Sequence, residues 1–428
     1  MSVETVIPRF FPVRQRFARP RVADLAAAVE VELARVFPQG SVRRGAEIGI
    51  TVGSRGITAI AELTRTAVSF LRARGATPFI IPAMGSHGGA EADAQAHLIA
   101  HYGVTEESVG APIRRAMETR HLGRTAEGVE VHMAETAWRS DGVLLMNRVK
   151  PHTDFKGPIE SGLTKIGAIG LGKLAGAQEY HSHIFGIGLG NAIRSVTARL
   201  IETGKIRGGL AILENAYHET ARLAGVTLDG WFAQEEALLR EAFGLMGRLP
   251  IDEIDVLFID RIGKNISGAG MDTNIIGRGT YGYVAGEPWQ PGMPSITRIV
   301  LSDLSDESDG NGVGMGMAEY CTRKFFDKVN HRITALNAMT ANAPMGARTP
   351  VVLDNDREAL RAGVRTCARR PEGPLVVYIR DTLSLEDVWL SEACLPLVAG
   401  RDGVEVLDEP SALGFDDDGN VFSPFARA

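Results

Sequence analysis

Short apolar runs alternate with amphipathic segments along the first half of the chain. "AEIGITVG" (46–53) is almost uniformly apolar, which predicts a buried strand. "TAIAELTRTAVSFLRARG" (58–75) has helical periodicity, basic residues in its last turn and a glycine stop. The same alternation follows with a strand at 76–83 and a helix at 90–103, then strands at 141–149 and 208–215 around a helix at 190–205. This rhythm predicts a mainly parallel sheet covered by helices.

A second series of the same kind begins near residue 250. It starts with "IDEIDVLFIDRIGKN" and continues through "SITRIVLSDL", helices over 315–345, "TPVVLDN", "EALRAGVR" and "PLVVYIRD". We therefore predict an α/β protein of two α/β domains with mainly parallel sheets and an interdomain active-site cleft. The predicted N-terminal domain is 1–250 and the C-terminal domain is 251–400. Residues 401–428 form a tail that could pack back on the N-terminal domain.

Three glycine-containing loops follow predicted strands of the first series. They are "GSRG" (53–56), "MGSHGG" (84–89) and "KPHTDFKGPIESGLTK" (150–165). Glycine is enriched overall, with 49 residues among 428, and it lets a backbone approach a ligand closely. Because ligands of such sheets bind at the carboxyl ends of the strands, the three loops predict one shared site.

Several histidines stand in or beside these loops and could carry acid–base or metal chemistry. His87 lies between glycines, and His152 follows a stiffening proline, so both are candidates for proton transfer near neutral pH. His181 and His183 are two residues apart in "EYHSH". They would share a face on a strand, as two metal ligands might, but would diverge on a helix.

Cationic residues accompany the histidines. Arg55 could hold a carboxylate through its guanidinium fork, or it could cap the next helix. Lys150, Lys156 and Lys173 are expected to be solvated or to face a phosphate. Lys165 differs, because its apolar neighbours "GLT" and "IGAIGLG" predict partial burial, which favours a neutral and nucleophilic amine.

Composition and charge narrow the class of protein. The formal net charge of −6 argues against a nucleic-acid or membrane-surface partner, which would favour a basic face. No apolar run is long enough to cross a bilayer, and the N-terminus lacks the apolar region of a signal peptide. Three widely spaced cysteines suggest neither a disulfide framework nor a zinc site. We therefore expect a cytoplasmic protein with a small-molecule substrate.

The chain thus combines the glycine loops after the strands with "KPHTDFKG", the following lysine and "EYHSH". Taken as a set, these motifs resemble the nickel-dependent lactate racemase family. The resemblance is clearest over 45–220. It implies a two-domain α/β isomerase, a racemase or epimerase of a 2-hydroxy acid. The implied cofactor is a nickel-pincer nucleotide, a pyridinium mononucleotide that holds Ni through two sulfurs and a carbon. Cofactor-maturation enzymes would then be partners of this protein. The sequence leaves the oligomeric state open, and a homodimer is one possibility.

The resemblance also implies roles for individual residues. His87 and His152 would be the catalytic acid–base pair, and His181 would be the protein ligand to nickel. Lys165 would bind the cofactor. Arg55 would hold the substrate carboxylate. The Cα hydride would move to the pyridinium ring and return to the other face, while the two imidazoles exchange the hydroxyl proton from opposite sides.

Two features depart from the family pattern. The stretch between His152 and Lys165 is longer, which leaves open whether Lys165 is tethered covalently. The second-domain loop "RIGKNISGAGMDTN" has no clear glutamine, which leaves Lys264 as its substrate-binding residue and the identity of the hydroxy acid open. Ser54 and Lys156 complete the residues assigned to cofactor binding. Two other functions remain: a metal-dependent lyase or dehydratase, and a non-catalytic metal- or nucleotide-binding homologue.

Overall fold

The computed structural model describes residues 6–54 and 56–425, which form two compact units. Unit 2 runs from Ala18 to Met246, and unit 1 combines the chain up to Phe17 with the chain from Gly247 onward. This division differs from the predicted one, because the first strand of the chain belongs to the sheet of unit 1. An α/β organisation with mostly parallel sheets is found in both units, as the sequence predicted.

The sheet of unit 2 has the strand order β3-β2-β6-β7-β8, in which neighbours up to β7 are parallel and β8 is antiparallel to β7. A separate hairpin pairs β4 with β5. Alternate side chains of β6 face opposite sides, so Leu144 and Val143 enter different cores. The strands are β2 (Glu47–Val52), β3 (Thr77–Pro82), β4 (Thr119–Arg124), β5 (Glu130–Ala134), β6 (Gly142–Arg148), β7 (Ile206–Glu214) and β8 (Thr220–Val226).

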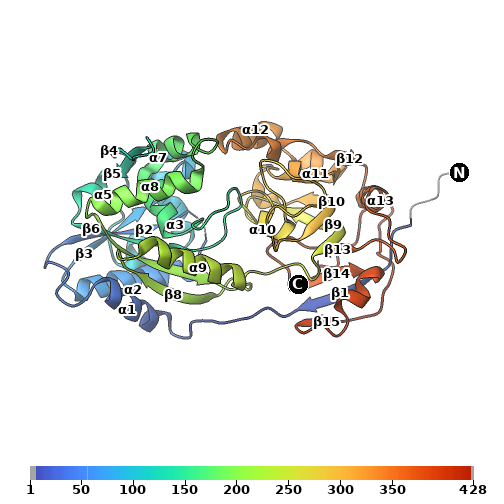
Figure 1. The fold of residues 1–428 in the computed structure, drawn as a ribbon, viewed down its shortest axis with the longest axis horizontal. Helices are drawn as coiled ribbons and strands as arrows, with labels where there is room; N and C mark the ends of the chain where they lie inside the picture. The colour runs from blue at the N-terminus through green and yellow to red at the C-terminus, as the bar shows by residue number, and fades with distance from the viewer. Residues whose placement is uncertain (1–5, 55, 426–428) are drawn as a thin grey trace. The chain divides into compact units, whose positions relative to one another are not determined.

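Helices cover both faces of this sheet (Figure 1). One core lies between the sheet and α1 (Leu25–Val36), α2 (Ile60–Ala73), α3 (Ala92–His101) and α4 (Glu106–Val109). The other core lies against α5 (Glu135–Arg139), α6 (Leu163–Lys165), α7 (Leu171–Ser182), α8 (Leu189–Glu202) and α9 (Trp231–Leu245). One turn of π-helix, Ile166–Gly170, joins α6 to α7.

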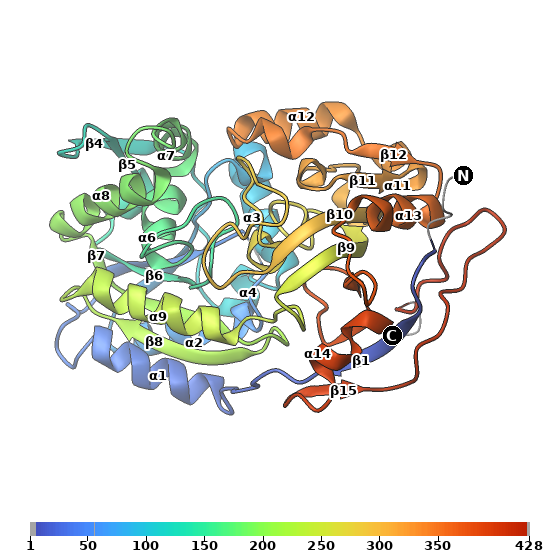
Figure 2. The same cartoon turned by 45° about the vertical axis from the view of Figure 1, so that its right-hand side comes forward.

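The sheet of unit 1 has the order β12-β11-β10-β9-β13-β14-β1-β15. Its strands from β12 to β13 are parallel, and β14, β1 and β15 extend it by antiparallel pairing. Figure 2 labels β9, β10, β11 and β12 of the parallel part, and β1 and β15 of the antiparallel part. The strands are β1 (Phe10–Gln15), β9 (Glu253–Ile262), β10 (Ser295–Leu304), β11 (Tyr320–Thr322), β12 (Val351–Leu353), β13 (Val376–Ile379), β14 (Asp387–Ser391) and β15 (Val404–Val406). The helices are α10 (Thr273–Ile276), α11 (Arg323–Lys328), α12 (His331–Thr340), α13 (Asp356–Thr366) and α14 (Leu395–Val398).

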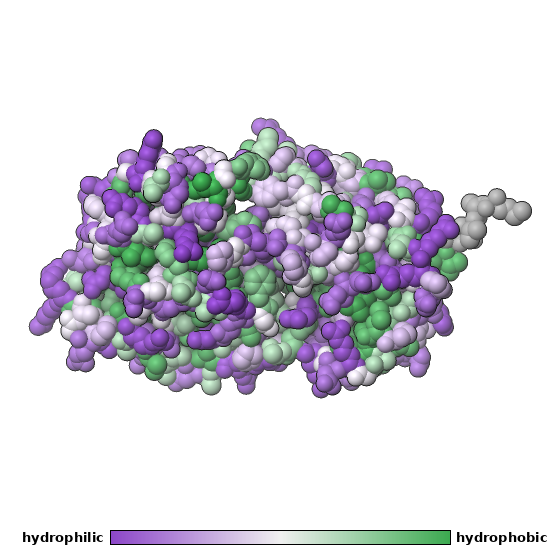
Figure 3. Space-filling model, in the orientation of Figure 1, coloured by the Kyte–Doolittle hydropathy of each residue, from purple (hydrophilic) through white to green (hydrophobic). Residues whose placement is uncertain are grey.

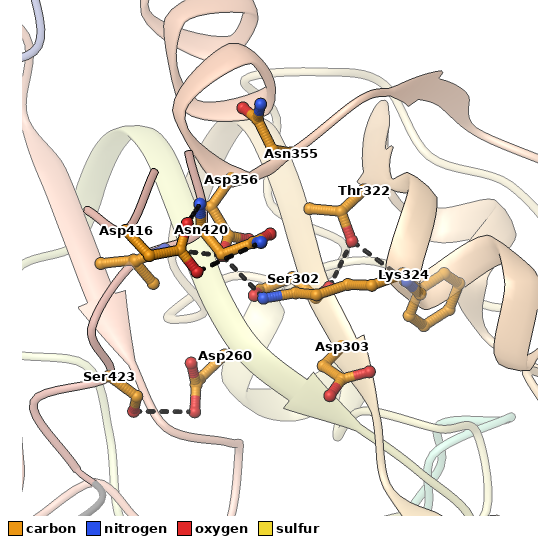
Figure 4. A network of polar contacts seen from close by, with 12 residues as sticks. Asp260, Ser302, Asp303, Thr322, Lys324, Asn355, Asp356, Asp416, Asn420 and Ser423 are labelled. Carbon is orange, nitrogen blue, oxygen red and sulfur yellow. Dashed lines mark hydrogen bonds and ion pairs between the residues drawn. The ribbon is translucent and has the colours of Figure 1, made fainter. Parts of the chain in front are cut away.

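The C-terminal segment of the chain packs within unit 1 through a polar network (Figure 4). The fully buried carboxylate of Asp356, at the start of α13, pairs with Lys324 at 2.7 Å and accepts the Val421 N–H at 3.0 Å. Ser423 donates to Asp260 on β9 at 3.1 Å. The predicted tail is therefore a part of unit 1, held by the carboxyl ends of its strands and by α13.

The surface mixes hydrophilic and apolar residues over the face seen in Figure 3. Most of the large apolar side chains lie in the cores, with exceptions such as Leu336 and Met339 on α12. Within the described ranges, none of the helices has both the length and the apolar character needed to span a bilayer.

Candidate functional site

The three glycine loops emerge at one edge of the sheet of unit 2. Strand β2 pairs in parallel with β3 on one side and with β6 on the other, so the carboxyl ends of all three strands lie next to one another. The loops 53–56, 84–89 and 150–165 follow these ends directly. The predicted placement of the three loops at one edge is confirmed, and it is the position where α/β sheets bind ligands.

The backbone of His152 is fixed by a buried ion pair. Glu160, almost fully buried, accepts the His152 N–H at 2.5 Å, and Lys156 donates to the His152 carbonyl at 2.7 Å. Lys156 and Glu160 also contact each other at 3.1 Å. Burial raises the pKa of Glu160, although Lys156 opposes that shift. Glu160 and Lys156 thus bind the backbone N–H and the carbonyl of His152, which restricts where the His152 ring can lie.

The His152 ring is bonded at both nitrogens. Its Nδ1 accepts the Asp154 backbone N–H at 2.9 Å, and its Nε2 is hydrogen-bonded to Lys165 Nζ. The Phe155 ring packs beside the imidazole, with centroids 4.4 Å apart. Since Nδ1 accepts a hydrogen bond, the ring proton of the neutral imidazole resides on Nε2.

This tautomer has a consequence for Lys165. With the ring proton on Nε2, that N–H group donates, and Lys165 Nζ would accept through the lone pair of a neutral amine. This is the form that the apolar neighbours of Lys165 favour. It shares its hydrogen bond with the imidazole proposed as an acid or base.

The short helix that carries Lys165 is held by a buried carboxylate from α9. Glu235, 1% exposed, accepts the Thr164 N–H at 3.0 Å and is also bonded to the Thr164 hydroxyl. Trp231 donates its Nε1–H to the same hydroxyl at 2.9 Å. A Cβ at Gly162 would come within 2.0 Å of Glu235, so only glycine fits before the helix. Burial raises the pKa of Glu235 to about 7, against the effect of the Thr164 donors.

The two histidines of "EYHSH" have different partners. His181 lies in the last turn of α7 and donates Nδ1–H to the Ala177 carbonyl at 2.6 Å, which places its lone pair on Nε2. Burial lowers the pKa of His181. His183 instead directs Nε2 to Glu179 at 3.0 Å. His181 is thus a neutral imidazole suited to bind a metal through Nε2, whereas His183 forms a side-chain pair.

His87 lies in the loop after β3, within the short turn His87–Ala90. Its Nδ1 is hydrogen-bonded to Ser54 Oγ of the loop after β2, and Tyr102 donates to the Ser54 carbonyl at 3.3 Å. This contact joins two of the three loops. Ser54 therefore orients His87, a role that the sequence did not assign to it.

The loop that carries His87 also lies against the helix that carries His181. A Cβ at Gly85 would come within 2.6 Å of the Ala177 Cβ, which shows how closely the two backbones approach. Ala177 is the residue whose carbonyl orients His181. Packing therefore connects the surroundings of His87 with those of His181.

The sequence matches no protein-family model and no curated protein. Among solved structures, the chain is similar to a lactate racemase. This is the apoprotein from Thermoanaerobacterium thermosaccharolyticum, at 14% identity and a TM-score of 0.43, over 68% of this chain and 69% of that one. A structural-genomics target from Thermotoga maritima matches at 14% identity and a TM-score of 0.48, over 78% and 84%.

Arg55 lies outside the described residues. Two other cationic residues singled out in the sequence, Lys264 and Lys173, are held by hydrogen bonds. Lys264 belongs to unit 1, where its Nζ donates to the Gly268 carbonyl at 2.7 Å and to Asn337 at 2.9 Å. Lys173 was expected to be solvated or to face a phosphate, but its side chain is only 1% exposed. Its Nζ donates to the Pro82 carbonyl and to Gln95 Oε1.

Several residues that hold the site were not assigned to it from the sequence. Glu160 stands four residues after Lys156, a spacing that hinted at their ion pair. Glu235 and Gln95 approach the loops from distant helices, and nothing in their local sequence marks them. Among the described residues, no group of three or more histidine, cysteine or acidic side chains is placed to hold a metal ion.

We expect Lys165 to be the fastest-reacting lysine of its loop. At pH 7.5 an ordinary lysine is almost fully protonated, whereas the contact with His152 favours the neutral amine. Brief treatment with an acylating reagent, followed by peptide mass spectrometry, should label Lys165 before Lys156, whose ammonium pairs with Glu160. Equal labelling of the two lysines would contradict the neutral state of Lys165.

Glu235 should make the stability of unit 2 depend on pH. Its pKa rises from 4.5 to about 7 on folding, so the folded state holds the proton more tightly, and stability falls as pH rises between these values. Urea unfolding at pH 5 and pH 8 should show a decrease in the wild type, up to about 3 kcal/mol, that Glu235→Gln lacks. Glu236→Gln is the control, since Glu236 is exposed and pairs with Arg240. The same pH dependence in Glu235→Gln would refute this assignment.

Proposed function

We propose that this protein is a racemase or epimerase of a 2-hydroxy acid that uses a nickel-pincer nucleotide. The observation that carries the proposal is the hydrogen bond between His152 Nε2 and Lys165 Nζ. An imidazole and an amine in contact at the edge of the sheet where ligands bind support it. These are the residues that the resemblance assigned to proton transfer and to cofactor binding.

The donor groups of the site suit that cofactor. His181 presents Nε2 as a neutral ligand, because its Nδ1–H is held by Ala177 and burial lowers its pKa. A single protein ligand is enough, since the nucleotide itself supplies the other atoms that hold nickel. Lys165 can bind the thiocarboxylate group through its neutral amine. When bound, the cofactor supplies hydride transfer at the carbon that carries the substrate hydroxyl.

The protein would supply the proton transfers and the orientation of the substrate. One imidazole, His152 or His87, would remove the proton of the substrate hydroxyl. The other would give a proton back to that oxygen from the opposite side. Arg55 would hold the carboxylate through both transfers.

Isotope retention tests this proposal. The protein is produced together with the cofactor-maturation enzymes and given single enantiomers of several 2-hydroxy acids that carry deuterium at Cα. Hydride return predicts the opposite enantiomer with its deuterium retained, and replacement by solvent hydrogen would overturn the proposal. Loss of water from the substrate would indicate a lyase or dehydratase. Absence of turnover by protein with a full complement of cofactor would indicate a non-catalytic homologue.

A further inference from the structure

Two buried polar side chains lie beneath the loop that carries His87. Lys173, from α7, donates to the Pro82 carbonyl at the end of β3 at 2.5 Å and to Gln95 Oε1 at 3.2 Å. Both Lys173 and Gln95 are 1% exposed. A buried ammonium and a buried amide are costly to desolvate unless their hydrogen bonds are made, and here they complete each other.

Gln95, from α3, contacts both Lys173 and the loop that carries His87. Its Nε2 donates to the carbonyls of Met84, Gly85 and His87 at 3.2, 3.0 and 3.1 Å. Three carbonyls at one end of the amide and an ammonium at the other define its orientation. One side chain therefore fixes the loop on both sides of the peptide that leads into His87.

The glycines of this loop supply no side-chain packing. Gly85 has no side chain to pack, and Gly88 and Gly89 adopt φ of 63° and 64°, where glycine is favoured. Glycines permit this tight path but leave the backbone mobile unless other groups restrain it. The position of His87 thus depends on hydrogen bonds from outside the loop.

Lys173 adopts a strained backbone to reach this place. Its φ is 53° and its ψ is −149°, inside a segment that is otherwise helical. Such conformations are unfavourable for residues with a side chain and concentrate at functional sites. Burial also lowers the pKa of Lys173 to about 8, so its charge is held at a further cost. The backbone strain and the buried charge are both tolerated at Lys173, whose hydrogen bonds reach the end of β3 and Gln95, the residue that restrains the His87 loop.

We propose that Lys173 and Gln95 form a buried clamp that positions His87 for acid–base catalysis. Both act through the loop 84–89, with Lys173 orienting the amide and Gln95 restraining the carbonyls. The catalytic part of this inference rests on the proposed function. The placement of His87 can be measured without any turnover.

The experiment compares Lys173→Met, Gln95→Leu and their double variant in the cofactor-matured protein. Lys173→Gly is added because glycine accepts the positive φ, so this variant removes the ammonium and relieves the strain together. Lys205→Met is the matched control, since Lys205 donates to the Ser140 carbonyl at the opposite end of the sheet. The rate at which diethylpyrocarbonate modifies His87 is followed by peptide mass spectrometry, with exposed His97 as the internal reference.

The clamp predicts that His87 is modified several-fold faster in all three single variants at the clamp, with His97 and the Lys205→Met control unchanged. It also predicts a fall in kcat of about 10–100-fold with little change in KM, the effect expected from misplacing a catalytic group. The double variant should be no worse than the worse single variant, because the two side chains act in series.

An unchanged rate at His87 in Lys173→Gly and Gln95→Leu would overturn the clamp, even if racemisation is observed. A rescue of wild-type kcat by Lys173→Gly would also overturn it, since the strain rather than the ammonium would then be responsible. Failure of the proposed function gives a different pattern. In that case no variant racemises any hydroxy acid, while the modification rate at His87 still reports on the clamp.

Discussion

Replacing His152 by alanine is expected to lower racemisation by about 10²–10⁴-fold, the usual contribution of general acid–base catalysis. The same loss is expected for His87→Ala. The reason is that each imidazole serves one direction of proton transfer, and either enantiomer needs both. Initial rates from the two pure enantiomers of an active 2-hydroxy acid, with nickel content measured alongside, check this expectation.

The nickel content separates loss of chemistry from loss of cofactor. Both variants should retain the metal, because the proposed protein ligand is His181. His97→Ala is the control, since His97 lies exposed on α3 and should keep full activity. Racemisation that survives in His152→Ala and His87→Ala would remove the two imidazoles from the mechanism.

The second large effect is expected from His181→Ala, which should release nickel and abolish the activity. His181 has its Nδ1–H on the Ala177 carbonyl and therefore presents Nε2, whereas the Nε2 of His183 faces Glu179. His183→Ala is thus a closely matched control two residues away, and it should keep both the metal and its visible absorption. Metal analysis of the purified, cofactor-matured proteins gives the readout without relying on turnover.

The reverse result would change the assignment. If His183→Ala lost the metal and His181→Ala retained it, the ligand would be His183, and Glu179 would have to release that side chain on cofactor binding. If both variants kept a full complement of nickel, neither histidine would be the ligand.

The placement of the site followed from the sequence. The apolar runs at 46–53, 76–83 and 141–149 are strands β2, β3 and β6, with the predicted ends within a few residues. Their loops had to meet at one edge, because parallel strands of one sheet share the direction of their carboxyl ends. The apolar neighbours of Lys165 likewise predicted the partial burial of its side chain, which the structure shows.

The division into units depended on long-range pairing. β1 pairs with β14 and β15, nearly four hundred residues away, so the start of the chain belongs to unit 1 and not to the domain that follows it in sequence. The pattern of apolar and polar residues shows that a segment can form a strand. It does not show which edge of which sheet will accept that strand, because any exposed edge offers the same backbone groups.

The sequence by itself determined the residue types of the site and the loops on which they stand, because both depend on local order along the chain. Only the tertiary structure decided how each side chain is used. Helical spacing separated His181 from His183, and Glu235 and Gln95 reached the loops from α9 and α3. Lys173 was expected to be solvated, but in the structure its side chain is buried and donates a hydrogen bond to the Pro82 carbonyl. Such contacts depend on the packing of distant elements, and no short stretch of sequence encodes them.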